Sequence, residues 1–88
     1  DELFSVIQSR KDEMPAGSYT SSLFEAGVDK IAQKVIEEAG ETALAGVKGD
    51  KDAIASEAAD MLYHTLVLMA ESGVKPEDVW DKLRERRG

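Results

Sequence analysis

Apolar residues recur at helical spacing along most of this chain, and no segment shows the alternation of apolar and polar residues that predicts a β-strand. In the segment 30–48, for example, Ile31, Val35 and Ala39 fall at successive turns of a helix. The pattern predicts helices over 2–14, 30–48 and 53–72, and a last helix that begins at Pro76; between the first two, a short turn is expected from Thr20 to about Gly27.

The ends of the predicted helices carry residues with strong capping preferences. Thr20 and Asp29 are expected to cap the helices that follow them, because their side-chain oxygens can accept backbone N–H groups. Gly49 and Asp50 are expected to end one long helix and start the next, and Gly73 occupies the usual position after a helix end. The short break at 48–50 predicts that the two long helices fold back on each other as an antiparallel pair.

The segment 53–72 is apolar nearly all round, which is typical of a buried helix. A chain of 88 residues buries only roughly 60% of its unfolded surface and has few other helices to cover this one. We therefore predict an all-α, antiparallel helical bundle, with 1–88 as a single domain, completed by homodimerisation. Tyr63, Val67 and Leu68 are expected to face their equivalents across a two-fold interface.

Two pairs of acids are the main chemical signal. Glu38 and Glu41 lie three residues apart on one long helix, and Glu57 and Asp60 lie three residues apart on the next. Residues at this spacing share a helix face, so antiparallel packing would bring the two pairs together. Clustered carboxylates repel one another unless a cation lies between them, and oxygen ligands suit Mg²⁺ or Mn²⁺. We expect these four residues to be metal ligands.

Four neighbouring residues have two possible roles each. Glu37 is an accessory acid or simply an ion-pair partner of Lys30 or Lys34 on the helix surface. The two lysines are phosphate contacts or surface partners of the acids. His64 lies one turn beyond Asp60, where a lone histidine is more often a hydrogen-bonded core residue than a ligand.

Composition narrows the possible partners and compartment. The formal net charge of −7 argues against binding of a nucleic acid polymer, which depends on many basic residues. The chain contains no cysteine, which excludes disulfides and thiol catalysis and fits a reducing compartment, so we expect a cytoplasmic protein. No run approaches the ~20 apolar residues of a membrane span, so no membrane association is expected.

The acidic motifs resemble those of the all-α, MazG-like nucleoside-triphosphate pyrophosphohydrolases. The run KVIEEAGE at 34–41 is similar to their EExxE motif, and EAADMLYH at 57–64 is similar to their ExxD motif. With the segment 18–20 upstream and the helix start at 76–79 downstream, essentially the whole chain resembles the phosphoribosyl-ATP pyrophosphohydrolase family of histidine biosynthesis.

The resemblance implies a role for each residue that matches these motifs. It makes Glu38, Glu41, Glu57 and Asp60 the ligands of Mg²⁺ or Mn²⁺, with Glu37 as an accessory catalytic acid. It makes Ser18, Tyr19, Thr20, Lys30 and Lys34 candidate substrate contacts.

The reaction implied is the hydrolysis of the α-β phosphoanhydride of phosphoribosyl-ATP to phosphoribosyl-AMP and pyrophosphate. Either Glu37 or Glu38 could be the general base. Two alternatives stay open from the residues alone. The first is a housecleaning pyrophosphatase of ordinary or damaged nucleoside triphosphates, because metal ligands do not specify a base or ribose. The second is a non-catalytic helical dimerisation module whose acids are only solvated.

Overall fold

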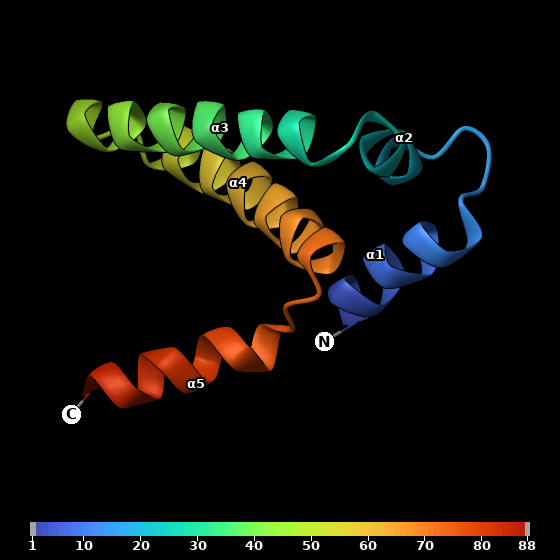
Figure 1. The fold of residues 1–88 in the computed structure, drawn as a ribbon. Coiled ribbons are helices and arrows are strands. Elements are labelled where there is room, and N and C mark those ends of the chain that lie inside the picture. Colours follow the sequence, from blue (N-terminus) through green and yellow to red (C-terminus); the bar gives the residue numbers. More distant parts are fainter. Residues whose placement is uncertain (1, 88) are drawn as a thin grey trace.

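The computed structural model describes residues 2–87, which form five α-helices and contain no strand. The helices are α1 (Glu2–Glu13), α2 (Tyr19–Ala26), α3 (Val28–Lys48), α4 (Lys51–Ser72) and α5 (Pro76–Arg87). Figure 1 shows α3 and α4 folded back on each other, with α1 and α2 across one end of the pair and α5 on its own. The prediction of an all-α fold is confirmed for the described residues.

The hairpin of α3 and α4 is the most extensively packed pair of helices. Gly49 adopts φ 70°, a left-handed conformation that lets the chain leave α3 sharply. The Asp50 side chain accepts the backbone N–H of Ala53 at 3.1 Å and so caps the first turn of α4. This turn brings the carboxyl-terminal half of α3 beside the amino-terminal half of α4, as the sequence predicted.

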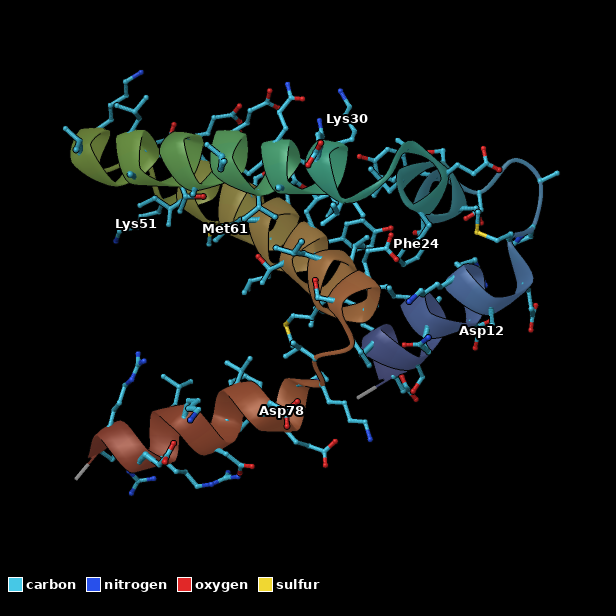
Figure 2. The ribbon with its side chains drawn as sticks, viewed as in Figure 1. Asp12, Phe24, Lys30, Lys51, Met61 and Asp78 are labelled. Carbon is cyan, nitrogen blue, oxygen red and sulfur yellow. The ribbon has the colours of Figure 1, made fainter. Side chains whose placement is uncertain are left out.

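The apolar core lies at the open end of this hairpin, where α1 and α2 cover it. Its buried members come from four helices: Ile7, Leu23, Phe24, Ile31, Val67 and Ala70. Figure 2 shows Phe24 of α2 near the place where α1 and α4 approach each other. Lys11 of α1 donates to the carbonyl oxygen of Ala70 at 3.1 Å, which satisfies one of the free carbonyl groups at the end of α4.

Two of the predicted helix caps are wrong. Ser18, and not Thr20, caps α2, since the Ser18 hydroxyl oxygen accepts the N–H of Ser21 at 3.2 Å. Gly27 occupies the cap position of α3 without a side-chain hydrogen bond, so that helix begins earlier than expected. Asp29 lies inside its first turn, where a negative charge is favourable next to the helix dipole.

The prediction for the surface of α4 is wrong in part. Val67 has no exposed surface and belongs to the chain's own core, so Val67 cannot face a second subunit. Tyr63 and Leu68 are partly buried against the same core. Leu62, in contrast, is 59% exposed on α4. The helices of one chain therefore cover more of α4 than its length and composition suggested.

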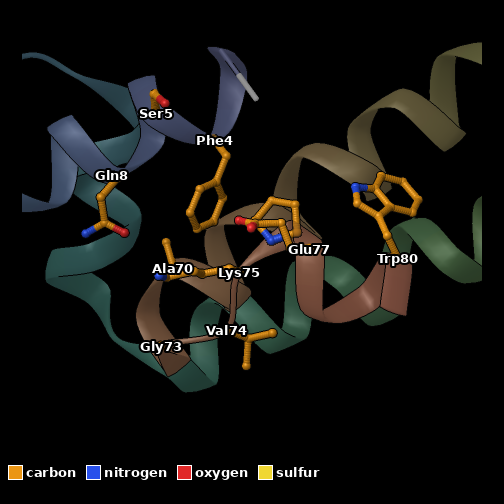
Figure 3. A pocket seen from close by; sticks show the side chains of 10 residues that line it. Phe4, Ser5, Gln8, Ala70, Gly73, Val74, Lys75, Glu77 and Trp80 are labelled. Atoms are coloured by element: carbon orange, nitrogen blue, oxygen red, sulfur yellow. The ribbon is translucent and has the colours of Figure 1, made fainter. Parts of the chain in front are cut away.

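The last helix, α5, makes only slight contact with the other four. A pocket of about 570 Å³ lies between its start and α1. Figure 3 shows Phe4 projecting into this region from α1, with Ala70 of α4 close by and Trp80 on α5. None of the four candidate metal ligands lines this pocket. No helix among residues 2–87 combines the length and the hydropathy that crossing a membrane would require.

Candidate functional site

The four acids predicted as ligands lie on the facing helices of the hairpin. Glu38 and Glu41 come from α3, and Glu57 and Asp60 come from α4. Their exposure differs, because Glu38 is 8% exposed, Glu57 is half-buried, and Glu41 and Asp60 are exposed. The fold therefore gives these side chains one common region that reaches from the inside of the hairpin to its surface.

The charges in this region act on one another. The pKa of Glu57 is raised above its usual value of 4.5, first by hydrogen bonding with the Glu41 side chain and then by desolvation. The negative charges of Glu41, Asp60 and Glu38 raise this pKa further. All three other acids thus lie close enough to disfavour the ionised form of Glu57. The four carboxylates therefore form an acidic cluster around Glu57.

The chemistry of this donor set suits a hard divalent cation. Carboxylate oxygens are the usual protein ligands of Mg²⁺ and Mn²⁺, and mutual repulsion is what a bound cation relieves. Within residues 2–87, no three carboxylate or imidazole groups lie close enough together to hold a metal ion. The backbones of α3 and α4 place the four acids on facing helices, and a shared metal site would require their side chains to rearrange.

His64 lies beneath this cluster and is hydrogen-bonded on both ring nitrogens. It is 5% exposed, and its Nδ1 lies 2.6 Å from Oε1 of Glu38 and 2.9 Å from the carbonyl oxygen of Asp60. Its Nε2 lies 2.8 Å from the hydroxyl of Tyr19. The interpretation of His64 as a hydrogen-bonded core residue agrees with these contacts.

Aromatic side chains link α2 to the site. The rings of Tyr19 and Tyr63 lie 6.4 Å apart between centroids and are nearly parallel, and both rings contact His64 edge to face. The hydroxyls of Tyr63 and Thr20 are hydrogen-bonded. Tyr63 was not among the predicted site residues. The available signal was its position beside His64 in the second acidic motif.

The cationic side chains near the site differ in their surroundings. Lys34 lies 4.0 Å from Glu37, and Gln33 donates to the same carboxylate at 3.1 Å, so Glu37 has surface partners on its own helix. Lys30 is exposed at the end of α3 nearest α2 (Figure 2).

The pKa of Tyr19 is influenced by burial and by the charged side chains around it. Partial burial raises the pKa of the Tyr19 phenol, and the charges of Glu38 and Asp60 raise it further, while Lys34 lowers it. Lys34, Glu38 and Asp60 therefore all lie near the Tyr19 hydroxyl.

The segment 18–20 has structural contacts of its own. Ser18 caps α2, Thr20 is buried and paired with Tyr63, and Tyr19 is 53% exposed. Tyr19 is therefore the member of this segment best placed to meet a ligand. A second opening, a shallow pocket of about 260 Å³, lies beside Glu41 and Glu57 near the hairpin turn.

Comparison with known proteins gives a consistent set of relatives. The sequence profile of the family described as Phosphoribosyl-ATP pyrophosphohydrolase matches residues 1–87. A phosphoribosyl-ATP pyrophosphatase of Azospirillum brasilense is 53% identical over 88 residues, which are 100% of this chain and 79% of that protein. One from Saccharolobus solfataricus is 45% identical over 99% of this chain and 93% of its own length. The histidine biosynthesis bifunctional protein HisIE of Bacteroides thetaiotaomicron is 49% identical over 91% of this chain and 39% of that protein.

Proposed function

The chain belongs to the phosphoribosyl-ATP pyrophosphohydrolase family, and we propose that it hydrolyses phosphoribosyl-ATP to phosphoribosyl-AMP and pyrophosphate in histidine biosynthesis. The proposal is supported by relatives of that name that align with nearly the whole chain. The observation that supports it within the molecule is the electrostatic coupling of four acids on α3 and α4. A triphosphate substrate carries enough negative charge to need a cation at such a site.

Mg²⁺ is the proposed cofactor, with Mn²⁺ as a substitute. Glu38, Glu41, Glu57 and Asp60 would hold it, because their oxygens form the acidic cluster described above. When bound, the ion would act as a Lewis acid and neutralise phosphate charge.

The remaining residues of the site would orient the substrate and accept a proton. Lys34 carries a positive charge beside the cluster, where it can pair with a phosphate oxygen in place of Glu37. Tyr19 presents an exposed ring and a hydroxyl at the same edge. Water attacks the anhydride link between the α- and β-phosphates, the link breaks to give phosphoribosyl-AMP and pyrophosphate, and a carboxylate takes up a proton of that water. Glu37 and Glu38 are both candidates for this general base.

Ser18, Thr20 and Lys30 complete the proposed substrate-binding set. Lys30 is exposed one helical turn before Lys34 and can reach an outer phosphate. Ser18 caps α2 and Thr20 is hydrogen-bonded to Tyr63, so we propose that these two residues hold Tyr19 in position for the substrate.

The proposed working unit is a homodimer in the cytoplasm with a MazG-like arrangement of helices. Large apolar side chains on the hairpin are more than half exposed in the single chain: Ile36, Leu44, Val47 and Leu62. At about 100° per residue, those on α3 lie opposite the buried Ile31, so α3 presents an apolar surface on both sides. Such a surface marks an interaction site. The absence of cysteine agrees with a reducing compartment.

The proposed reaction is tested by measuring pyrophosphate release from phosphoribosyl-ATP with and without Mg²⁺. We expect release that depends on Mg²⁺ or Mn²⁺ and stops with a chelator. ATP is the matched control, because it carries the same triphosphate without the added phosphoribosyl group. Equal turnover of ATP would favour a general nucleoside-triphosphate pyrophosphatase. No release from either substrate would reject the catalytic proposal.

A further inference from the structure

We propose that His64 is a positioning residue, which fixes the direction of the Glu38 carboxylate and connects it to Tyr19. This inference rests on the proposed role of Glu38 as a metal ligand. His64 and Glu38 are 5% and 8% exposed, and their side chains are 2.6 Å apart. A buried contact of this kind restricts both side chains, whereas an exposed ion pair does not.

The contacts of the ring determine where its proton lies. Nδ1 of His64 faces two acceptors, the Glu38 carboxylate at 2.6 Å and the carbonyl oxygen of Asp60 at 2.9 Å. An ionised carboxylate and a carbonyl oxygen can only accept, so with Glu38 ionised Nδ1 carries the hydrogen. In the neutral ring, Nε2 then has a free lone pair and accepts the hydroxyl hydrogen of Tyr19 at 2.8 Å. The hydrogen bonds thus run in one direction, from Tyr19 through His64 to Glu38.

Three helices meet at this one side chain. Nδ1 joins the carboxylate of α3 to the backbone of α4 at Asp60, and Nε2 joins both to α2. The contact occupies Oε1 of Glu38 and leaves the second carboxylate oxygen for a cation. Groups that orient a metal ligand in this way typically change metal affinity by about 10–100-fold when they are removed.

The exposed Tyr19 ring is the end of this series of hydrogen bonds that lies at the protein surface. Tyr19 is also the residue of its segment best placed to touch the substrate. A substrate that holds the Tyr19 hydroxyl in place would therefore also hold the His64 ring and the Glu38 carboxylate. We infer that His64 makes the geometry of a metal ligand depend on the position of α2.

Two substitutions at His64 separate positioning from packing. In His64→Asn the amide nitrogen takes the place of Nδ1 and can still donate to Glu38. In His64→Gln the amide takes the place of Nε2, so Tyr19 keeps a partner and Glu38 loses its own. The measurement is the dissociation constant of Mn²⁺, by calorimetry on the substrate-free protein below its melting temperature. We expect His64→Gln to weaken Mn²⁺ binding at least about tenfold. We expect His64→Asn to stay within about threefold of the wild type, by the same criterion.

Val67→Ala is the control for a purely structural effect, because Val67 is buried on the same helix outside the site. It should lower the melting temperature without changing Mn²⁺ affinity. Folded His64→Gln with wild-type affinity would overturn the positioning role alone. Equal losses in both His64 variants, in proportion to their loss of stability, would also overturn it. A wild-type protein that binds no Mn²⁺ would reject both the metal site and this inference.

The position of the ring proton gives a second measurement that needs neither metal nor a variant. Two-bond ¹H–¹⁵N correlation spectra of the labelled wild-type protein distinguish the two ring nitrogens, and His64 is the only histidine in the chain. We expect the hydrogen on Nδ1 near neutral pH. A ring protonated on Nε2 alone would overturn the proposal, and this result decides the question if His64→Gln does not fold.

Discussion

Carboxylates that crowd onto two facing helices repel one another unless a proton or a cation lies between them. In this protein the effect is concentrated on Glu57, whose pKa is raised by its hydrogen bond with Glu41 and by the surrounding acids. The ionised cluster therefore destabilises the folded state in the absence of metal. The same repulsion would favour cation binding, so the stability of the metal-free cluster and its proposed function are opposed.

Neutralising Glu57 should stabilise the metal-free protein in a way that depends on pH. A carboxyl group whose pKa is higher in the folded state contributes most below its usual value of 4.5, and this contribution is lost as the pH rises through the folded value. Glu57→Gln resembles the protonated form at every pH. We therefore expect it to be more stable than the wild type at pH 7, with a difference that shrinks toward zero near pH 4.5.

Chemical denaturation in the presence of a chelator measures this difference. Glu25→Gln, on the exposed surface of α2, is the control and should show no comparable change with pH. A Glu57→Gln variant that is no more stable than the wild type at pH 7 would indicate that the four acids are solvated separately.

Asp60→Asn should reduce turnover by at least about a hundredfold at saturating Mg²⁺. A catalytic metal contributes several kcal/mol of charge stabilisation, and about 1.4 kcal/mol corresponds to tenfold in rate. We expect Glu41→Gln to behave in the same way. Asp52→Asn, an identical change at an exposed position of the same helix, should leave turnover nearly unchanged. Near wild-type rates in Asp60→Asn would remove this residue from the ligand set.

For single residues, the sequence predicted which acids lie near one another but not which side chains contact His64. The spacing of Glu38, Glu41, Glu57 and Asp60 was enough to predict that the two pairs lie near each other, because helical periodicity and a short turn determine their positions, whereas their role as metal ligands stays a prediction. The partners of His64 were not predictable. Its contact with Glu38 spans 26 residues and depends on how α3 packs against α4, and its contact with Tyr19 spans 45 residues and depends on how α2 docks onto the hairpin.

At the level of helices, the local sequence predicted well which segments form helices, but it predicted less well the residue at which each helix begins. Gly49, Asp50 and Gly73 lie at the predicted boundaries, because left-handed glycine and a capping aspartate act through their own backbone. Ser18 and Thr20 both have capping side chains, and the Ser18 hydroxyl is the one that accepts the first-turn N–H group. Thr20 is instead paired with Tyr63, a tertiary contact that local preference does not report.

Asp50→Ala should lower the stability of the hairpin by about 1 kcal/mol, the usual cost of losing a capping side chain. The Asp50 carboxylate accepts the N–H of Ala53, and alanine leaves that donor without a protein partner. For a protein of this size the melting temperature should fall by roughly 4–8 °C for each kcal/mol. Lys51→Ala, at the exposed neighbouring position, is the control. A shift in Asp50→Ala no larger than in the control would show that water replaces the cap at no cost.

For the molecule as a whole, Mg²⁺ should raise the melting temperature. A ligand that binds only the folded state stabilises it by RT ln(1 + [L]/Kd), about 2.7 kcal/mol at a hundredfold excess over Kd. Sodium chloride at matched ionic strength separates specific binding from screening of the acids. We expect a large shift with Mg²⁺ or Mn²⁺ and a small shift with salt alone. Equal shifts in the two solutions would favour a solvated acidic surface.

Val67 was wrongly predicted to face a second subunit, because its surroundings depend on the packing of the whole molecule. Helical periodicity indicated that 53–72 is covered on several sides, but it could not decide which cover comes from the chain itself. In the folded chain, α1 and α2 supply the surface around Val67 and Ala70. Leu62 remains uncovered, as does the outer side of α3. A core shared between two subunits stays a prediction, but Leu62 and the outer side of α3 now replace Val67 at its centre.

Leu62→Glu should therefore separate subunits without disturbing the fold of one chain. Leu62 is 59% exposed, so a glutamate there is solvated in a monomer but becomes a buried, unpaired charge in a dimer that covers it. Leu3→Glu is the matched control, since Leu3 is 45% exposed and lies on α1, outside the two helices of the hairpin. Light scattering at micromolar concentration should find the wild type and Leu3→Glu as dimers and Leu62→Glu as a monomer with intact helical circular dichroism. A dimeric Leu62→Glu would exclude this part of α4 from the interface, and a monomeric wild type would reject the dimer while leaving the acidic cluster on α3 and α4 as it is.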